Sequence, residues 1–279
     1  MPYALNGSLR LYWDEAGSGT PVLLVMGATY SSRMWYPVIE TLATCHRVIW
    51  FDNRGIGRSQ ATRTGSIEDM ASDAVAVLDA AAVERAHIYG ASLGGVVVLQ
   101  IARQSPERVQ SLVLGCTGIL SEDKPRSPRL LNALAYLPAG VRRSLMGRLG
   151  RGGYGSAASA EAVARDLAVI AEDRASASGL VQQQNALRAY ALQPADVASM
   201  NVPAMVLHGT EDKAVPFAYG QELAATLPGA QFIAFEGAGH NYLVAYPDRA
   251  NEVVLQFLAE VDRTVVEDTA VGGNLPCGT

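Results

Sequence analysis

The chain has 279 residues, of which 49% are apolar and 18% are charged. A chain of this length buries about 70–75% of the surface that its unfolded form exposes, which excludes a small disulfide-stapled scaffold and a disordered chain. The formal net charge of −5 at pH 7 is opposite to the basic balance of nucleic-acid-binding proteins, so no nucleic-acid partner is expected.

The apolar runs and the cysteines favour a cytoplasmic location. No apolar run approaches the roughly 18 residues that cross a bilayer, so no membrane span is expected. The first residues, MPYALNGSLRLYW, contain no basic stretch followed by an apolar run, so no secretory signal is expected. Cys45, Cys116 and Cys277 lie far apart and are odd in number, which favours reduced thiols.

Short apolar runs alternate with longer helical patterns along the chain. The first 13 residues predict a hairpin strand at a sheet edge, and six strands follow at 21–26, 47–51, 86–90, 111–115, 203–209 and 230–237. Helices are predicted at 33–44, 67–83, 94–104, 217–227 and 248–262. Continuous apolar strands separated by helices indicate an α/β fold, with a mostly parallel, twisted sheet covered on both faces.

The alternation stops near residue 119 and resumes near residue 202. Residues 120–201 are helical in pattern and too many for a bare loop, which predicts a helical lid inserted into a core of 1–119 and 202–264. Residues 265–279 are polar and rich in Gly, and we expect a flexible C-terminal tail there.

Ser92, in Gly90-Ala91-Ser92-Leu93-Gly94, lies between a predicted strand and a predicted helix. In this context a G-x-S-x-G motif forms a sharp turn that exposes a nucleophilic serine. The glycines let neighbouring backbone pass close to that turn. An ordinary Gly/Ser turn is the alternative explanation.

Two later loops supply an acid and a histidine. Glu211 and Asp212 follow one predicted strand, and His240 follows the next. The carboxyl ends of parallel strands meet at one edge of the sheet, which is where ligands bind in such folds. A hydroxyl, a carboxylate and an imidazole are therefore expected together, in the chain order Ser, Asp, His of one triad family.

With these motifs the chain resembles the α/β-hydrolase superfamily over about 1–120 and 200–262. Residues 51–59, FDNRGIGRS, are similar to the family's D-x-R-G-x-G-x-S turn. The segments SSRMWYPVIETLA, ERAHIYGASLGG and SPERVQSLVLGCTG resemble 3-oxoadipate enol-lactonases and related small esterases. The resemblance implies a serine hydrolase that cleaves a carboxylic ester or lactone through an acyl-enzyme on Ser92.

The resemblance also implies the roles of three side chains. Ser92 is the expected nucleophile, His240 the general base and then acid, and Asp212 the carboxylate that orients His240. Glu211 competes with Asp212 for the last role. Asp212 is preferred because it matches the family acid, four residues before Pro216.

The backbone N–H groups of Ala28 and Leu93 are expected to form an oxyanion hole. The family usually carries His-Gly where this chain has Met26-Gly27, a change that leaves the backbone donors in place but removes a polar side chain. Ala91 is a second departure, because many relatives have a larger residue there. The expected substrate pocket includes Met26, Thr29, Tyr136 and Met146.

Other polar residues are expected to be structural. Asp52 and Arg54 lie in a Gly-rich turn and are expected to pin neighbouring loops by buried, charge-assisted hydrogen bonds. His46, His87 and His208 are expected to be packing or exposed residues. No His, Cys or Asp cluster has metal-ligand spacing, so neither a metal nor another cofactor is expected.

Residues 124–151 contain seven basic residues and no acidic residue. Solvated helix faces explain such a charge. The alternative is a lid that meets a carboxylate-bearing substrate, a phosphopantetheine arm or an acidic carrier protein. Reaction class also has alternatives. Enzymes of this fold catalyse eliminations, cyclisations and lyase steps, and a ligand receptor can be built on the same scaffold.

Overall fold

The computed structural model describes residues 2–62, 64–124, 136–137, 141, 153–172 and 176–272. The described residues form one eight-stranded sheet in the order β1-β2-β4-β3-β5-β6-β7-β8. The hairpin β1–β2 and the pair β2–β4 are antiparallel, and all the other pairs are parallel. The strands are β1 (Tyr3–Asn6), β2 (Leu9–Ala16), β3 (Pro21–Val25), β4 (Arg47–Phe51), β5 (Ala86–Ala91), β6 (Val109–Gly115), β7 (Ala204–Gly209) and β8 (Gln231–Phe235). The expected edge hairpin and mostly parallel sheet are confirmed.

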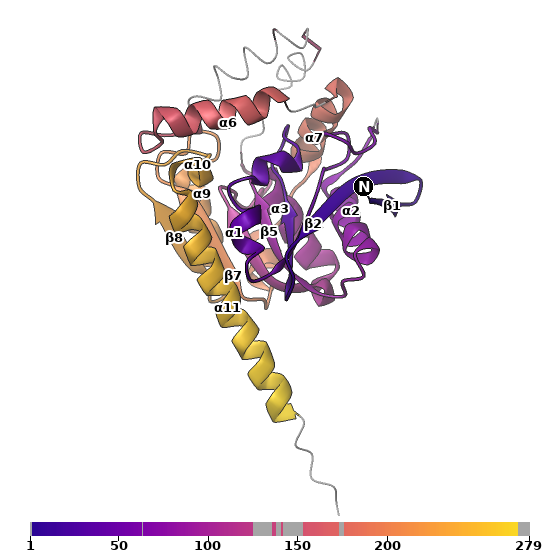
Figure 1. Ribbon diagram of the computed structural model, residues 1–279, viewed down its shortest axis with the longest axis vertical. Helices are drawn as coiled ribbons and strands as arrows, with labels where there is room; N and C mark the ends of the chain where they lie inside the picture. Colours follow the sequence, from indigo (N-terminus) through magenta and orange to yellow (C-terminus); the bar gives the residue numbers. More distant parts are fainter. Residues whose placement is uncertain are drawn as a thin grey trace, which may run out of the picture.

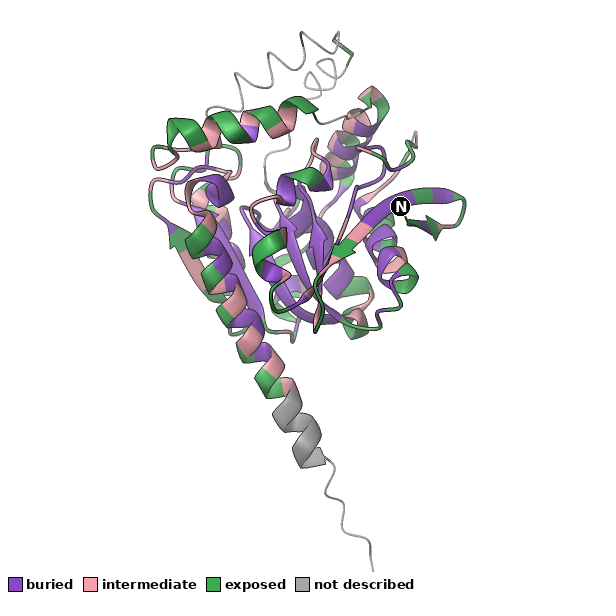
Figure 2. Ribbon diagram, in the orientation of Figure 1, coloured by how far each residue is buried: buried purple, intermediate pink, exposed green. Residues whose placement is uncertain are grey.

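Helices cover both faces of this sheet (Figure 1). In β3, Val22 and Leu24 belong to one buried cluster, whereas Leu23 and Val25 belong to another. This two-sided burial explains why the strands are continuously apolar rather than alternating. The first cluster includes residues of α1 (Ile39–Leu42) and α11 (Pro247–Gly272), and the second includes residues of α2 (Ile67–Ala80), α3 (Leu93–Gln104) and α9 (Phe217–Thr226). Figure 2 shows the strands buried between these layers.

The helix predicted at 33–44 is wrong as one continuous element. The structure has a short 3-10 helix, η1 (Ser32–Trp35), and then α1, which begins at Ile39. Pro37 lies between them, and a proline has no N–H to continue the helical hydrogen bonds. A second 3-10 turn, η2 (Pro106–Arg108), precedes β6.

The described part of the chain between β6 and β7 contains three helices joined by turns and irregular segments. It contains α6 (Ala160–Glu172), α7 (Ala177–Ala189) and α8 (Pro194–Ala198), and α10 (Tyr242–Ala245) follows β8. Figure 1 shows α6 crossing above α10. Of residues 125–152, which include most of the basic segment, the structure describes 136, 137 and 141.

The C-terminal helix is longer than predicted. Helix α11 continues to Gly272, so residues 265–272 are helical rather than part of a tail. The segment Val265-Val266-Glu267-Asp268 has no proline or glycine to end the helix, whereas Gly272 and Gly273 follow shortly after. Residues 273–279 lie outside the described part of the chain.

Candidate active site

Ser92 is placed by a strained turn between β5 and α3. Its backbone has φ 56° and ψ −119°, a conformation that costs energy for a residue with a side chain. The strain is held by a hydrogen bond from Ser92 N to Gly115 O, at 2.8 Å. A Cβ atom at Gly94 would collide with the carbonyl of Val25, and one at Gly90 would collide with the carbonyl of Gly94. Glycine at both positions is therefore required by close backbone contact.

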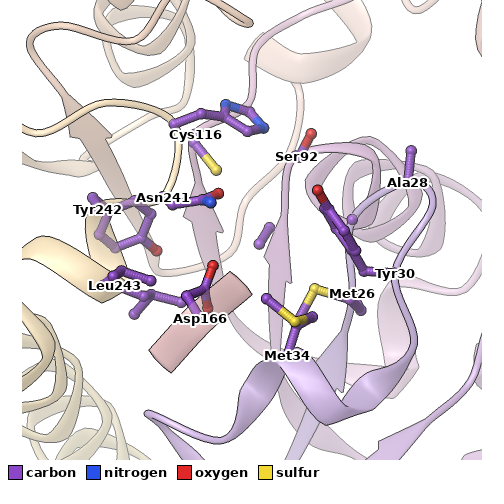
Figure 3. A pocket seen from close by; sticks show the side chains of 14 residues that line it. Met26, Ala28, Tyr30, Met34, Ser92, Cys116, Asp166, Asn241, Tyr242 and Leu243 are labelled. Atoms are coloured by element: carbon purple, nitrogen blue, oxygen red, sulfur yellow. The ribbon is translucent and has the colours of Figure 1, made fainter. Parts of the chain in front are cut away.

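Ser92 and His240 line one cavity of about 560 Å³, counting the space at its open mouth. Figure 3 shows Ser92, Cys116 and Asn241 around this space, with Met26 and Met34 on its wall. The lining residues come from the loops after β3, β5, β6 and β8 and from η1, α6 and α10. The carboxyl edge of the sheet therefore carries the cavity, as open α/β sheets require.

Asp212 holds His240 in place. Its Oδ2 lies 2.8 Å from His240 Nδ1, and its Oδ1 accepts hydrogen bonds from the backbone N–H groups of Ala214 and Val215. Burial alone would raise the pKa of Asp212, but hydrogen bonds from His208 and His240 hold it well below its usual range. An ionised Asp212 can only accept, so His240 carries its proton on Nδ1 and presents Nε2 as an acceptor.

The pKa of the His240 imidazole is subject to opposing effects. Burial would lower its pKa, but the Cys116 sulfur and the Asp212 carboxylate raise the pKa well above its ordinary value. His240 therefore becomes a cation readily, which is what a base that must carry a proton between two steps requires.

Glu211 does not contact His240. This exposed carboxylate accepts hydrogen bonds from Ser156 N and Ser156 Oγ, at 2.8 and 2.7 Å. Those hydrogen bonds lower the pKa of Glu211. Glu211 therefore joins the loop after β7 to the chain that leads into α6, and the acid beside the imidazole is Asp212.

The two expected oxyanion donors lie on either side of the serine turn. Leu93 is the first residue of α3, where backbone N–H groups have no acceptor within their own helix. Ala28 lines the cavity, and a Cβ on Gly27 would lie 3.2 Å from the Ala91 carbonyl oxygen. The loop after β3 thus packs directly against the serine turn.

The expected pocket residues divide into three cases. Met26 lines the cavity. Thr29 and Tyr136 are not among the described lining residues: Thr29 N donates a hydrogen bond to Gln183 on α7, and Tyr136 is 71% exposed. Met146 lies outside the described residues.

Asp52 and Arg54 pin loops, as expected. Asp52 accepts hydrogen bonds from Ser32 and Arg58, whereas Arg54 binds Asp73 on α2 through two hydrogen bonds of 2.6 and 2.8 Å. They therefore belong to two separate ion pairs rather than to one pair with each other.

Three groups at the opposite, amino end of the sheet could hold a metal ion. Ligand atoms of His46, His87 and Asp262 all lie within 4.8 Å of one another. Two of these groups already have protein partners, because Asp262 accepts a hydrogen bond from Gln110 and His87 Nδ1 lies 2.7 Å from Ser111 Oγ. Their sequence separations could not have indicated this cluster.

Asp166 is the charged cavity residue that the sequence motifs do not indicate. It lies on α6 and is fully buried, whereas the apolar residues near it on that helix, such as Val163, Val169 and Ile170, are only half-buried. An acid on an apolar helix face was the signal that could have found it. Tyr30, Met34, Cys116, Asn241, Tyr242, Leu243 and Val244 also line the cavity without belonging to an expected site.

A twisted parallel sheet with a serine on a strained strand–helix turn, and a His–Asp pair at the same edge, defines a hydrolase of the α/β class. A family model for the alpha/beta hydrolase fold matches residues 20–244, and the chain belongs to this family. Among the described residues, no helix is both long and apolar enough to cross a membrane.

Individual relatives cover almost the whole chain. A proposed carbamate hydrolase of Azorhizobium caulinodans, RutD, is 32% identical over 275 residues, which is 94% of this chain and 100% of that protein. The solved structure of Est816, an N-acyl homoserine lactone degrading enzyme, is 28% identical with a TM-score of 0.76 and covers 92% and 100% of the two chains. An enol-lactonase from Burkholderia xenovorans LB400 shares the fold at 23% identity, with a TM-score of 0.81 over 92% of this chain and 100% of that one.

Proposed function

We propose that the chain is a serine hydrolase that cleaves a carboxylic ester or lactone of a small, largely apolar substrate through an acyl-enzyme on Ser92. The observation that carries this proposal is the 2.8 Å contact between His240 Nδ1 and Asp212 Oδ2 on the cavity that Ser92 also lines. A hydroxyl becomes an effective nucleophile when a base removes its proton during attack, and an oriented imidazole supplies that base.

In the first step Ser92 Oγ forms a bond to the substrate carbonyl carbon, and its proton passes to His240 Nε2. The carbonyl oxygen takes up the negative charge and accepts hydrogen bonds from the N–H groups of Ala28 and Leu93. Asp212, ionised and held by two backbone N–H groups, stabilises the imidazolium that forms.

Collapse of this intermediate breaks the bond to the leaving oxygen, which takes the proton from His240. A water molecule then attacks the acyl-enzyme, and His240 accepts a proton from it. The second collapse releases the carboxylic acid and returns the proton to Ser92 Oγ, so the enzyme is regenerated without a cofactor.

A carbamate is the second candidate substrate. The support is the RutD relative, which is 32% identical over 94% of this chain and carries that activity in its name. The same attack by Ser92 on a carbamate carbonyl would place a carbamoyl group on the serine. Turnover of a carbamate and an ester by one preparation would compare the two candidates directly.

We also propose that residues 120–201 form the lid over this cavity, in a chain whose core is 1–119 and 202–264. The support is Asp166 on α6, which lines the cavity from the inserted segment. We propose a cytoplasmic location as well. The support is that Cys45 and Cys116 are both free thiols, because reduced cysteines are typical of cytoplasmic proteins.

The test combines a covalent probe with one variant. A fluorophosphonate should label the wild-type chain at Ser92, which mass spectrometry of the tryptic peptide would locate. Ser92→Ala should abolish labelling and reduce ester turnover by at least about 10³-fold. A receptor or a lyase with a disengaged serine would leave the probe unreacted, and near-full turnover by the variant would contradict the acyl-enzyme.

A further inference from the structure

Asp166 is the one carboxylate among the described residues that line the cavity with Ser92 and His240. It is fully buried. Figure 3 shows its carboxylate pointing into the cavity between Leu243 and Met34. Ionisable side chains are rarely buried without a partner, because removal of a charge from water costs free energy. The hydrogen-bond partners of the Asp166 carboxylate therefore determine which substrate groups it can bind.

Both hydrogen-bond partners of Asp166 are neutral hydroxyls. Tyr36 Oη donates to Oδ1 at 3.1 Å, and Tyr154 Oη donates to Oδ2 at 2.7 Å. Burial, with the Asp166 charge beside them, raises the pKa of both tyrosines, so they remain donors. The two donors come from the end of η1 and from the chain before α6, so the carboxylate is held from two sides.

The carboxylate retains unused acceptor capacity toward the cavity. An ionised carboxylate offers about four acceptor positions, and the two tyrosines occupy one on each oxygen. Burial raises the pKa of Asp166, and the two tyrosine hydroxyls oppose this rise. A substrate N–H or O–H group that reaches this carboxylate can therefore fill an acceptor position that the two tyrosines leave open.

We infer that Asp166 is a substrate-binding group that accepts a hydrogen bond from an N–H or O–H group of the substrate. The rest of this wall is apolar or neutral, including Met26, Met34, Leu243 and Val244. The same geometry excludes a substrate whose carboxylate would enter the cavity, because two carboxylates would then share one buried site. This inference rests on the proposed hydrolase function and narrows its substrate class to neutral or cationic donors.

The basic segment 124–151 carries the charge that would attract an acidic substrate or carrier. An acidic substrate or carrier that this segment attracts would have to keep its acidic group outside the cavity that Asp166 lines. The reactive part of the substrate would then be uncharged and carry a donor.

The test uses aryl esters of three acids of equal length, whose far ends are a carboxamide, an isopropyl group and a carboxylate. The wild-type chain should give the highest kcat/KM with the carboxamide and the lowest with the carboxylate. Asp166→Asn should reduce the preference for carboxamide over carboxylate by about 10- to 100-fold, the scale of a hydrogen bond to a charged group. The isopropyl ester should change much less.

Glu161→Gln is the matched control, because Glu161 lies on the same helix with its side chain exposed. It should leave all three kcat/KM values unchanged. If Asp166→Asn fails to fold, Tyr36→Phe replaces it, since loss of one anchoring donor should also weaken the carboxamide preference. A wild-type chain that shows no preference, or variants that slow all three esters equally, would overturn the role of Asp166.

Failure of the proposed hydrolase function would look different. In that case the wild-type chain would hydrolyse none of the three esters and would not react with the fluorophosphonate probe. Hydrolysis of all three esters without discrimination would leave the serine hydrolase intact and reject only the binding role of Asp166.

Discussion

At the scale of single residues, the environment of Asp212 separates it from its neighbour Glu211. Asp212 is buried and receives hydrogen bonds from two backbone N–H groups and from His240. Glu211 is exposed and bound to Ser156. One carboxylate can therefore fix the imidazole tautomer, whereas the other can only join two loops.

Substitution of each acid tests this division. Asp212→Asn should reduce kcat by up to about 10⁴-fold, because an amide favours the wrong imidazole tautomer. Glu211→Gln should reduce kcat far less, since its carboxylate touches only Ser156. Steady-state rates on one neutral ester would measure both, and equal losses would mean that the two acids share the role.

The titration of His240 should set the acidic limb of the activity profile. His240 must be neutral to accept the Ser92 proton, and its pKa lies above the ordinary value of 6.5. The value of kcat/KM should therefore fall as pH decreases, with a midpoint above pH 6.5. Rates of a neutral ester between pH 5 and pH 9 would locate the limb. A midpoint below pH 6 would contradict the raised pKa.

At the scale of elements, α11 is an amphipathic helix that packs one face against the sheet. The side chains of Val254, Phe257, Leu258 and Val261 are buried in the cluster that also contains Val22, Leu24 and Tyr89. The exposed residues between them, such as Gln256 and Glu260, give the helix the alternating surface seen in Figure 2. Packing against the sheet therefore stabilises this helix more than its intrinsic propensity does.

Removal of one buried side chain from α11 should measure that packing. Leu258 is completely buried, so Leu258→Ala should lower the free energy of unfolding by about 2–5 kcal/mol through lost burial and a residual cavity. Gln256→Ala, on the exposed side of the same helix, should change it by less than about 0.5 kcal/mol. Urea denaturation followed by circular dichroism would measure both variants. A similar loss in each would show that helix formation rather than packing is affected.

At the scale of the whole molecule, the two ends of the sheet differ in chemistry. The carboxyl end carries the cavity with Ser92, whereas the amino end buries His46 and His87 against Asp262 on α11. Burial is the largest influence on both of these histidines and lowers the pKa of each, although Asp262 opposes it. The folded protein therefore holds them neutral at a pH where the unfolded chain would protonate them.

This difference predicts how stability depends on pH. Below the unfolded pKa of about 6.5, the unfolded chain binds more protons than the folded chain, so stability should fall as pH decreases from 7 to 5. One histidine contributes at most about 1.4 kcal/mol per pH unit. His46→Gln should reduce this slope relative to wild type. Urea titrations at several pH values would show it, and an unchanged slope would mean that His46 is not held neutral.

The strands, the edge hairpin and the serine turn could be predicted from the sequence because each depends on neighbours in the chain. Apolar runs define strands buried on both faces, and the glycines around Ser92 are required by local backbone contacts. The helical pattern over 33–44 predicts one continuous helix, whereas Pro37 separates η1 from α1 in the structure. The order of strands then predicted that Ser92, Asp212 and His240 would lie at one edge.

The tertiary structure alone decided which side chains meet. Asp166 is held at the cavity wall by hydrogen bonds from Tyr36, which lies 130 residues earlier in the chain, and from Tyr154, which precedes α6. Gln183 of α7 accepts a hydrogen bond from the backbone N–H of Thr29. His46 and His87 lie beside Asp262 of α11, a helix that begins at Pro247, far along the chain from β4 and β5. Contacts between distant elements produce no repeating pattern in the sequence, because they depend on how the elements pack and not on the spacing of residues along the chain.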